Sequence, residues 1–134
     1  MPVCRPTGPP PQLVLAGTPE SVPAARAHAR EFVGFHVPEA GREHLDDVLL
    51  VVSELVTNAV RYGTEPGDSL LVVLDAGPGR VRIEVHDTRR RKPRRRPESA
   101  ARQRGHGLFI VDALAEWGVG ERPMGKIVWA VVRW

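Results

Sequence analysis

A carboxylate and an amide stand four positions apart in residues 52–62, at Glu54 and Asn58, and Tyr62 follows four positions later. On a helix, residues four apart lie about one turn apart and project from the same strip of its surface. A carboxylate can act as a general base, and an amide oxygen is a hard ligand suited to Mg²⁺. The pair therefore predicts a catalytic or cation-binding strip, with an ordinary solvated helix face as the alternative.

Two other groups with chemical potential follow along the chain. Asp87 stands where a predicted strand gives way to an irregular loop, and a carboxylate there can accept a hydrogen bond from an exocyclic amine such as that of adenine. The alternative for Asp87 is a strand-end residue that caps a turn. Gly105 and Gly107 open a predicted helix, where backbone N–H groups form a ready site for phosphates. Glycines at helix starts are also frequent without any ligand.

The helix that carries Glu54 and Asn58 is predicted from about residue 39 or 43 to residue 62, and Gly63 is a natural residue to end it. Its core-facing stripe consists of apolar residues at helical spacing: Leu45, Val48, Leu49, Val52, Leu55, Val56 and Ala59. At about 100° per residue, Glu54 and Asn58 point roughly 120–160° away from the centre of this stripe. They are therefore predicted to lie outside the core.

The remaining elements follow from apolar periodicity and turn residues. Thr18 is predicted to cap the first helix, followed by Pro19 at its first position. The predicted elements are a strand at 12–16, a helix from 18 to about 35, a hairpin of strands 69–75 and 81–85, a helix at 105–117 and a hairpin of strands 119–122 and 127–133. The order β-α-α-β-β-α-β-β predicts an α+β fold, a two-layer α/β sandwich with helices on one face of a mostly antiparallel sheet.

Composition predicts one soluble globular domain. The 134 residues are 42% apolar and 26% charged, which are ordinary values for such a domain. The apolar runs are much shorter than the roughly 20 residues of a membrane span, and no charged segment followed by an apolar h-region opens the chain. Cys4 is the single cysteine, so no internal disulfide can form. Together these features predict a cytoplasmic protein with no membrane association.

Two segments differ in composition from the rest of the chain. Residues 1–11 hold five of the thirteen prolines, which predicts a flexible tail before a single domain at 12–134. Residues 89–96 hold seven basic side chains against a formal net charge of +3 for the whole chain, so the remainder is mildly acidic. Such a run is typical of a solvated loop. Contacts with phosphates or an acidic partner are the alternative, and nucleic-acid binding ranks last because no aromatic residues interleave to stack bases.

The order of these motifs resembles the histidine kinase-like ATPase superfamily (GHKL), whose members share the Bergerat fold, over residues 12–134. Within it, the chain is most similar to the short anti-sigma regulatory serine/threonine kinases. Residues 53–62 resemble the N box of that family, and residues 105–111 resemble its second glycine motif. Trp117-Gly118, followed by residues 125–129, resembles its C-terminal ending.

The resemblance implies a site for ATP and Mg²⁺. Asn58 would ligate the Mg²⁺ that bridges the phosphates, Glu54 would be the base that orients the attacking hydroxyl or water, and Asp87 would bind the adenine amine. Residues 88–104 would form a basic lid loop over the phosphates. Further nucleotide contacts would come from residues near the helix ends and the lid: Tyr62, Gly105, His106, Gly107 and Leu108.

Two departures from the family pattern bear on this site. Thr88 and Arg89 stand after Asp87, where the superfamily usually has glycines. In the last hairpin, Gly125-Lys126 replaces the usual Gly-Thr. Both departures affect the expected nucleotide geometry more than the expected fold.

The resemblance implies an ATP-dependent serine/threonine protein kinase. Its substrate would be an anti-sigma-antagonist-like protein, and it would also sequester a sigma factor. The chain shows no helical hairpin with a phospho-accepting histidine and no second domain, so a complete sensor kinase or chaperone is not expected. The alternative is a non-catalytic, nucleotide-dependent protein-binding module. Glu54 favours the kinase, whereas the missing glycines after Asp87 favour the module. Homodimerisation is left open by the resemblance.

Overall fold

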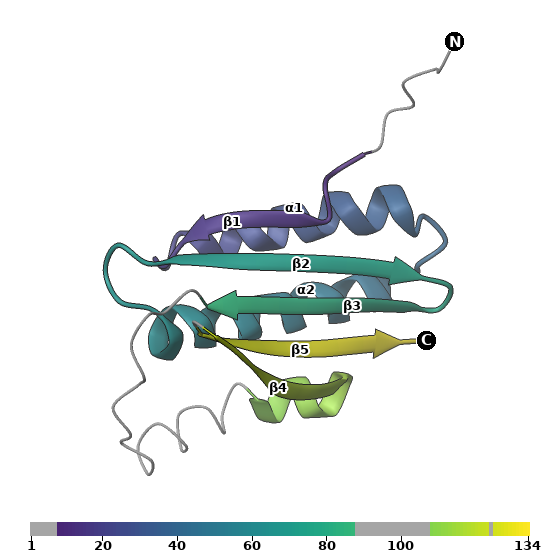
Figure 1. Cartoon of the computed structure of the whole chain (residues 1–134). Coiled ribbons are helices and arrows are strands. Elements are labelled where there is room, and N and C mark those ends of the chain that lie inside the picture. Colours follow the sequence, from purple (N-terminus) through teal and green to yellow (C-terminus); the bar gives the residue numbers. More distant parts are fainter. Residues whose placement is uncertain (1–7, 88–107, 124) are drawn as a thin grey trace.

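The computed structural model describes residues 8–87, 108–123 and 125–134 (Figure 1). Its strands are β1 (Gln12–Ala16), β2 (Ser69–Gly77), β3 (Arg80–Asp87), β4 (Glu116–Arg122) and β5 (Gly125–Arg133). Its helices are α1 (Ser21–His36), α2 (Arg42–Asn58), a π-helical turn η1 (Ala59–Gly63) and a helix over residues 108–114. The predicted lid loop at 88–104 lies outside the described residues. No helix within the described ranges has the length and apolar character that crossing a membrane requires.

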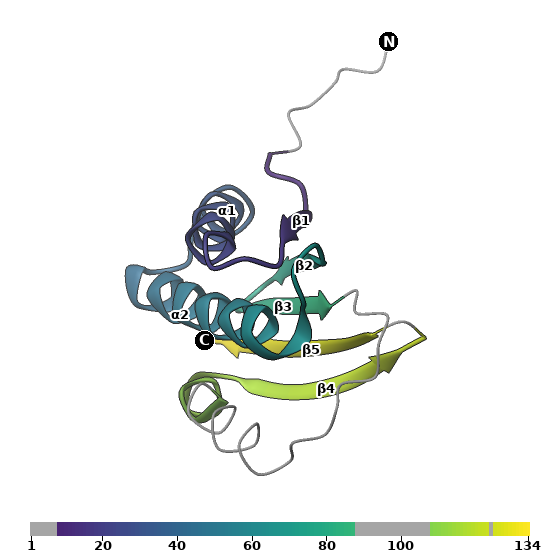
Figure 2. The same ribbon diagram turned by 90° about the vertical axis from the view of Figure 1, so that its left-hand side faces the viewer.

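The five strands form one sheet in the order β1-β2-β3-β5-β4, and every neighbouring pair is antiparallel. The helices α1 and α2 cover one face of the sheet, as the two views of the ribbon show (Figures 1 and 2). The predicted α+β two-layer sandwich is therefore confirmed. The central strand is β3, so a residue at its end is flanked by β2 on one side and β5 on the other.

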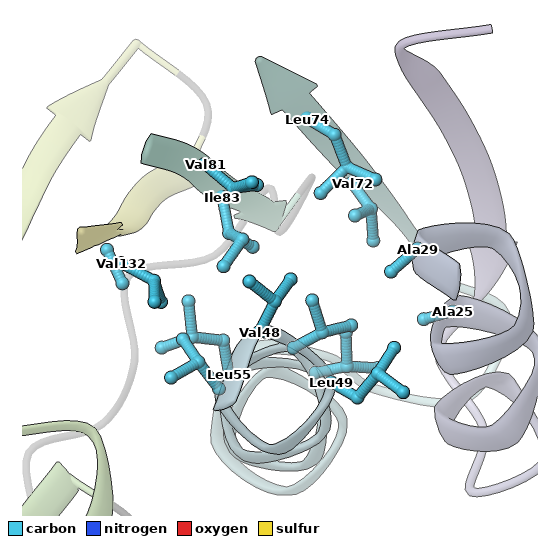
Figure 3. Packing of buried hydrophobic residues seen from close by; sticks show 14 of the residues in the cluster. Ala25, Ala29, Val48, Leu49, Leu55, Val72, Leu74, Val81, Ile83 and Val132 are labelled. Carbon is cyan, nitrogen blue, oxygen red and sulfur yellow. The ribbon is translucent and has the colours of Figure 1, made fainter. Parts of the chain in front are cut away.

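The core lies between α2 and the inward face of the sheet (Figure 3). Alternate residues of β2 and β3 point toward the helices, because successive side chains of a strand point to opposite faces of the sheet. On these strands the fully buried side chains are Leu70, Val72, Leu74, Val81, Ile83 and Val85. They meet the apolar stripe of α2, and Ala25 and Ala29 of α1 close the cluster at one side.

The buried face of α2 includes residues beyond the predicted apolar stripe. Most of the predicted residues are buried, while Leu45 and Ala59 are partly buried against the core. Val51 and Ser53 are buried as well. The Ser53 hydroxyl donates a hydrogen bond to the Leu49 carbonyl (2.8 Å), which satisfies it inside the core. The wider stripe shows that α2 is covered on more than one side.

The first helix begins at Ser21, two residues after its predicted first position at Pro19, and Thr18 does not cap it. The residue before the helix is Glu20, which makes no side-chain capping hydrogen bond. The carbonyl of Thr18 instead accepts a hydrogen bond from the Ser21 N–H (3.0 Å), and the Ser21 hydroxyl donates to the Ala16 carbonyl. The chain uses residues 18–20 as a turn from β1 into α1, so the capping prediction was wrong.

The helix predicted at 105–117 ends earlier, and its last residues belong to β4. Trp117 pairs with Ala130 of β5 in the sheet. Its indole N–H donates a hydrogen bond to an Asp112 carboxylate oxygen (3.1 Å), which ties the strand back to the helix. The helical pattern misled here because an apolar residue can face the same core from either element.

Residues 8–11 of the predicted N-terminal tail contact the domain. The Pro11 carbonyl accepts a hydrogen bond from the Leu74 N–H (2.8 Å). His36 of α1 lies with Nε2 3.3 Å from the Pro9 carbonyl oxygen. The flexibility of the tail stays a prediction, as does the boundary of the domain at residue 12.

Candidate functional site

A pocket opens where the C-terminal end of α2 meets the ends of β3 and β5. Its open volume is about 460 Å³, solvent-facing space included. Most of the wall is apolar: Ala59, Val85, Leu108, Val119 and Val128. Three polar residues, Asn58, Asp87 and Lys126, join them. Apolar walls with a few convergent polar groups are typical of a small-ligand site.

The register of the sheet brings the polar residues of β3 and β5 together. His86 pairs with Ile127, so Asp87 and Lys126 follow as the next neighbours on the two strands. Asp87 alternates with the core residues Ile83 and Val85, and it therefore lies on the helix-covered face. The site is thus an extension of the core beyond the last buried residues of β3.

Asp87 is held at the base of this pocket. It is only 5% exposed, and its Oδ1 accepts a hydrogen bond from the Lys126 backbone N–H (3.3 Å). A carboxylate accepts hydrogen bonds, so the group of a ligand that meets it must be a donor. Among the polar residues of the pocket, Asp87 therefore suits the amine edge of a ligand.

Asn58 and Glu54 occupy successive turns of α2. Asn58 is the last residue of the helix, is half-buried and lines the pocket. Glu54 is half-buried one turn earlier and does not line the pocket among the described residues. The structure therefore brings Asn58 and Asp87 together, while Glu54 stands beside the site rather than in it. The roles of both α2 residues stay predictions.

The other predicted contacts divide into two groups. Leu108 lies in the helix over 108–114 and forms part of the pocket wall. Tyr62 lies half-buried in η1, on the turn that follows Asn58. Gly105, His106 and Gly107 lie outside the described residues, so nothing in the structure tests them.

Sequence reasoning missed several residues of the pocket. Lys126 was noted only as a departure from a family pattern, yet it lines the pocket beside Asp87. Val119 of β4 is 57% exposed and forms the outer wall. Alternation on β5 could have indicated Lys126, because it shares a face with Val128 and Ala130. The register of β5 against β3 was needed to place it next to Asp87.

The opposite face of β3 carries a separate charged cluster. Glu84 accepts hydrogen bonds from Arg82 Nε (2.9 Å) and His86 Nε2 (2.8 Å). The Arg82 guanidinium also lies over the Trp129 ring, 4.7 Å from its centroid. Burial opposes the charged form of Glu84, but the hydrogen bonds from Arg82 and His86 outweigh it and lower the pKa of this carboxyl. The cluster belongs to the sheet surface rather than to the pocket.

Within the residues that the structure describes, no group of three or more His, Cys, Asp or Glu side chains is arranged to hold a metal ion. A cation at Asn58 would thus have one amide oxygen from the described pocket. Mg²⁺ commonly binds in this way, with one or two protein ligands and the rest from water and substrate phosphates. The residues of the pocket fit a metal that arrives with a phosphorylated ligand.

Comparison with known families identifies a matching family. A sequence profile described as histidine kinase-like ATPase domain matches residues 15–132, which is most of the chain and contains every residue of the pocket. A comparison with curated proteins finds no match.

Proposed function

This chain belongs to the histidine kinase-like ATPase domain family, and from this premise we propose that the pocket binds ATP and that the protein is a serine/threonine protein kinase of the anti-sigma type. The observation that carries the proposal is the meeting of Asp87 and Asn58 in one pocket with apolar walls. A carboxylate acceptor and a cation-binding amide are the two polar groups that an adenine nucleotide needs at its opposite ends.

The base of the nucleotide would lie against the apolar wall near Asp87. Val85 and Val128 come from neighbouring strands, and Ala59 comes from η1. Small aliphatic side chains on two sides leave room for a flat ring. Asp87 would accept a hydrogen bond from the exocyclic amine of adenine, whereas the carbonyl of guanine would place an acceptor against an acceptor.

The phosphates would extend toward the end of α2. Asn58 would hold Mg²⁺ through its amide oxygen. When bound, this ion supplies charge neutralisation for the phosphoryl group that is transferred. The chain itself contributes Asn58 as a fixed ligand at a helix end, because α2 is anchored in the core by the residues just before it.

Glu54 would act on the protein substrate. As the serine or threonine oxygen of the substrate attacks the γ-phosphorus of ATP, Glu54 would take the hydroxyl proton and ADP would leave. Its position one turn before Asn58, beside the pocket rather than in its wall, is compatible with a base that faces an incoming protein. The substrate would be an anti-sigma-antagonist-like protein, and a sigma factor would be the second partner.

One observation favours a second function, a nucleotide-dependent binding module without catalysis. Thr88-Arg89 replaces the glycines that usually follow the aspartate in this superfamily. In that case ATP would change the affinity of the protein for its partner without phosphoryl transfer. Either function could operate in a homodimer.

The test of ATP binding is a calorimetric titration with Mg-ATP. Asn58→Ala should abolish the Mg²⁺-dependent part of the affinity, since it removes the one amide oxygen offered to the ion. The fold should persist because Asn58 lies at the end of α2, outside the buried stripe. Asp46→Ala, an exposed change on the same helix, serves as the control and should bind as the wild type does. Unchanged Mg-ATP binding by Asn58→Ala would remove Asn58 from the site.

A further inference from the structure

Two glycines from distant parts of the chain lie against the two sides of Asp87. A Cβ atom added at Gly63 would lie 2.9 Å from Asp87 Oδ2 and 3.2 Å from Asp87 Cβ. A Cβ atom added at Gly125 would lie 2.6 Å from Asp87 Oδ1 and would collide with the Asp87 carbonyl oxygen. The carboxylate therefore occupies a cradle that only glycine leaves open on both sides.

Backbone conformation does not explain these two glycines. Within the described part of the chain, the glycines with positive φ are Gly8, Gly67 and Gly79. Gly63 and Gly125 are absent from that group, so other residues could adopt their φ angles. What excludes a side chain is the space taken by Asp87: its side chain at Gly63, and its carbonyl oxygen together with its carboxylate at Gly125.

The π-helical turn explains how Gly63 reaches Asp87. In an α-helix at about 100° per residue, positions 58 and 63 would point about 140° apart. In a π-helix the backbone bond joins residues five apart. The turn η1 (Ala59–Gly63) therefore brings Gly63 round toward the side of Asn58. Asn58, just before the turn, and Gly63, at its end, then face the same region: Asn58 lines the pocket and Gly63 lies beside Asp87.

We propose that Gly63 and Gly125 are positioning residues that fix the orientation of the Asp87 carboxylate and so set how strictly the pocket selects adenine over guanine. The inference rests on the proposed ATP site. Rotation of an aspartate carboxylate about χ2 is broad when nothing restricts it. Here the Asp87 Oδ1 atom accepts a hydrogen bond from the Lys126 N–H (3.3 Å) and lies against Gly125. The Asp87 Oδ2 atom lies against Gly63.

A single methyl group should therefore be enough to disturb the selection of the base. Contacts under 3.0 Å are ones that real Cβ atoms essentially never show, so either Asp87 or the turn η1 must shift if Gly63 becomes alanine. In catalytic sites, a misplacement of about 1 Å can cost on the order of 100-fold in rate, which shows how sensitive positioned groups are to small shifts. The effect should appear as a loss of discrimination between bases, because phosphate contacts at Asn58 are unchanged.

The experiment compares Kd values for Mg-ATP and Mg-GTP by calorimetry. The chain offers matched controls: Gly34 is helical like Gly63, Gly120 lies in a strand like Gly125, and a Cβ at either control meets nothing within 4 Å. Gly63→Ala and Gly125→Ala should each lower the preference for ATP over GTP at least tenfold. Gly34→Ala and Gly120→Ala should keep the wild-type preference.

A second comparison separates positioning from general destabilisation. If the glycines act through the aspartate, adding Gly63→Ala to Asp87→Asn should cost no further preference for ATP, a non-additivity that a damaged fold would not give. If the alanine variants lack a cooperative unfolding transition, their fold is damaged. In that case Asp87→Glu takes their place: it lengthens the side chain between the same two glycines and should also lose the preference for ATP over GTP.

The outcomes distinguish this inference from the function on which it rests. A wild type that does not bind Mg-ATP would refute the ATP site itself. A wild type that prefers ATP, together with folded Gly63→Ala and Gly125→Ala variants that keep that preference, would refute the positioning role alone. Full selectivity in Asp87→Glu would refute it as well.

Discussion

At the scale of single residues, Asn58 and Glu54 share one strip of α2 but not one environment. Asn58 ends the helix and lines the pocket, whereas Glu54 is a turn earlier and outside the lining. A ligand in the pocket would therefore contact Asn58 directly. In the proposed mechanism, Glu54 acts on a hydroxyl side chain of the protein substrate.

This difference predicts the behaviour of Glu54→Gln. The change keeps the shape and hydrogen-bonding capacity of the side chain but removes the base. Affinity for Mg-ATP should stay within about twofold of the wild type, while phosphoryl transfer should fall by about 10²–10⁴-fold. The rate of phosphoryl transfer is measured with labelled ATP and a purified anti-sigma-antagonist-like protein from the same organism. Asp46→Asn, which changes an exposed acid on α2, is the control. Transfer at the wild-type rate in Glu54→Gln would leave Glu54 with a structural role only.

Local sequence patterns identified some residues of the candidate site and not others, for a physical reason. Asn58 and Asp87 were singled out because helical spacing and a strand end are features of short segments. Lys126 and Gly63 join the pocket and its cradle through contacts with Asp87, which is 39 and 24 positions away. Those contacts depend on the β3–β5 register and on a π-helical turn, and neither is encoded in an apolar period.

At the scale of elements, β3 faces two different environments. Its inward residues are buried in the core and lead to Asp87. Its outward residues form the cluster of Arg82, Glu84 and His86, in which Glu84 accepts hydrogen bonds from both of the other side chains. The strand that supports the pocket is thereby also stabilised from the opposite face.

The lowered pKa of Glu84 predicts a pH-dependent contribution to stability. Because this pKa is lower in the folded protein than in the unfolded chain, the contribution is fully present above the unfolded value of about 4.3 and is lost as the pH falls through the folded value. Glu84→Gln should lower the free energy of unfolding by about 1 kcal/mol at pH 7.

Urea unfolding at pH 7 and at pH 3 measures this contribution. The gap between wild type and Glu84→Gln should narrow at pH 3, where the wild-type carboxyl also begins to lose its charge. Asp75→Asn is the matched control, since Asp75 pairs with Arg80 on the exposed end of the same hairpin. Its effect should be smaller because the pair is solvated. An equal gap at both pH values for Glu84→Gln would contradict the charged network.

The elements themselves were predicted with uneven success. Strand β1 has its predicted ends at residues 12 and 16, because turn residues bound a short apolar run. The end of α2 differs, since the apolar stripe continues through residue 59 and gives no sign that the backbone widens into η1. Residues 116 and 117 were assigned to a helix but pair with β5. Pairing between strands decided that case, and such pairing is not local.

At the scale of the whole molecule, the pocket depends on elements from almost the full length of the chain. The core cluster joins α1, α2, β2, β3 and β5 with Val111 of the helix over 108–114. The walls of the pocket come from α2, η1, β3, β4, β5 and that same helix. An unfolded chain cannot assemble these walls, so a ligand of the pocket should bind only the folded state.

Ligand binding should consequently stabilise the entire domain and not one part of it. At a free Mg-ATP concentration about 100 times Kd, linkage predicts about 2.7 kcal/mol of added stability. For a domain of this size, that corresponds to a rise in Tm on the order of 10 °C. The near-ultraviolet and far-ultraviolet circular dichroism transitions should move together, because one core connects the elements. Asn58→Ala should show little of the shift under the same conditions. A shift seen by only one of the two signals would mean that the pocket elements unfold separately from the core.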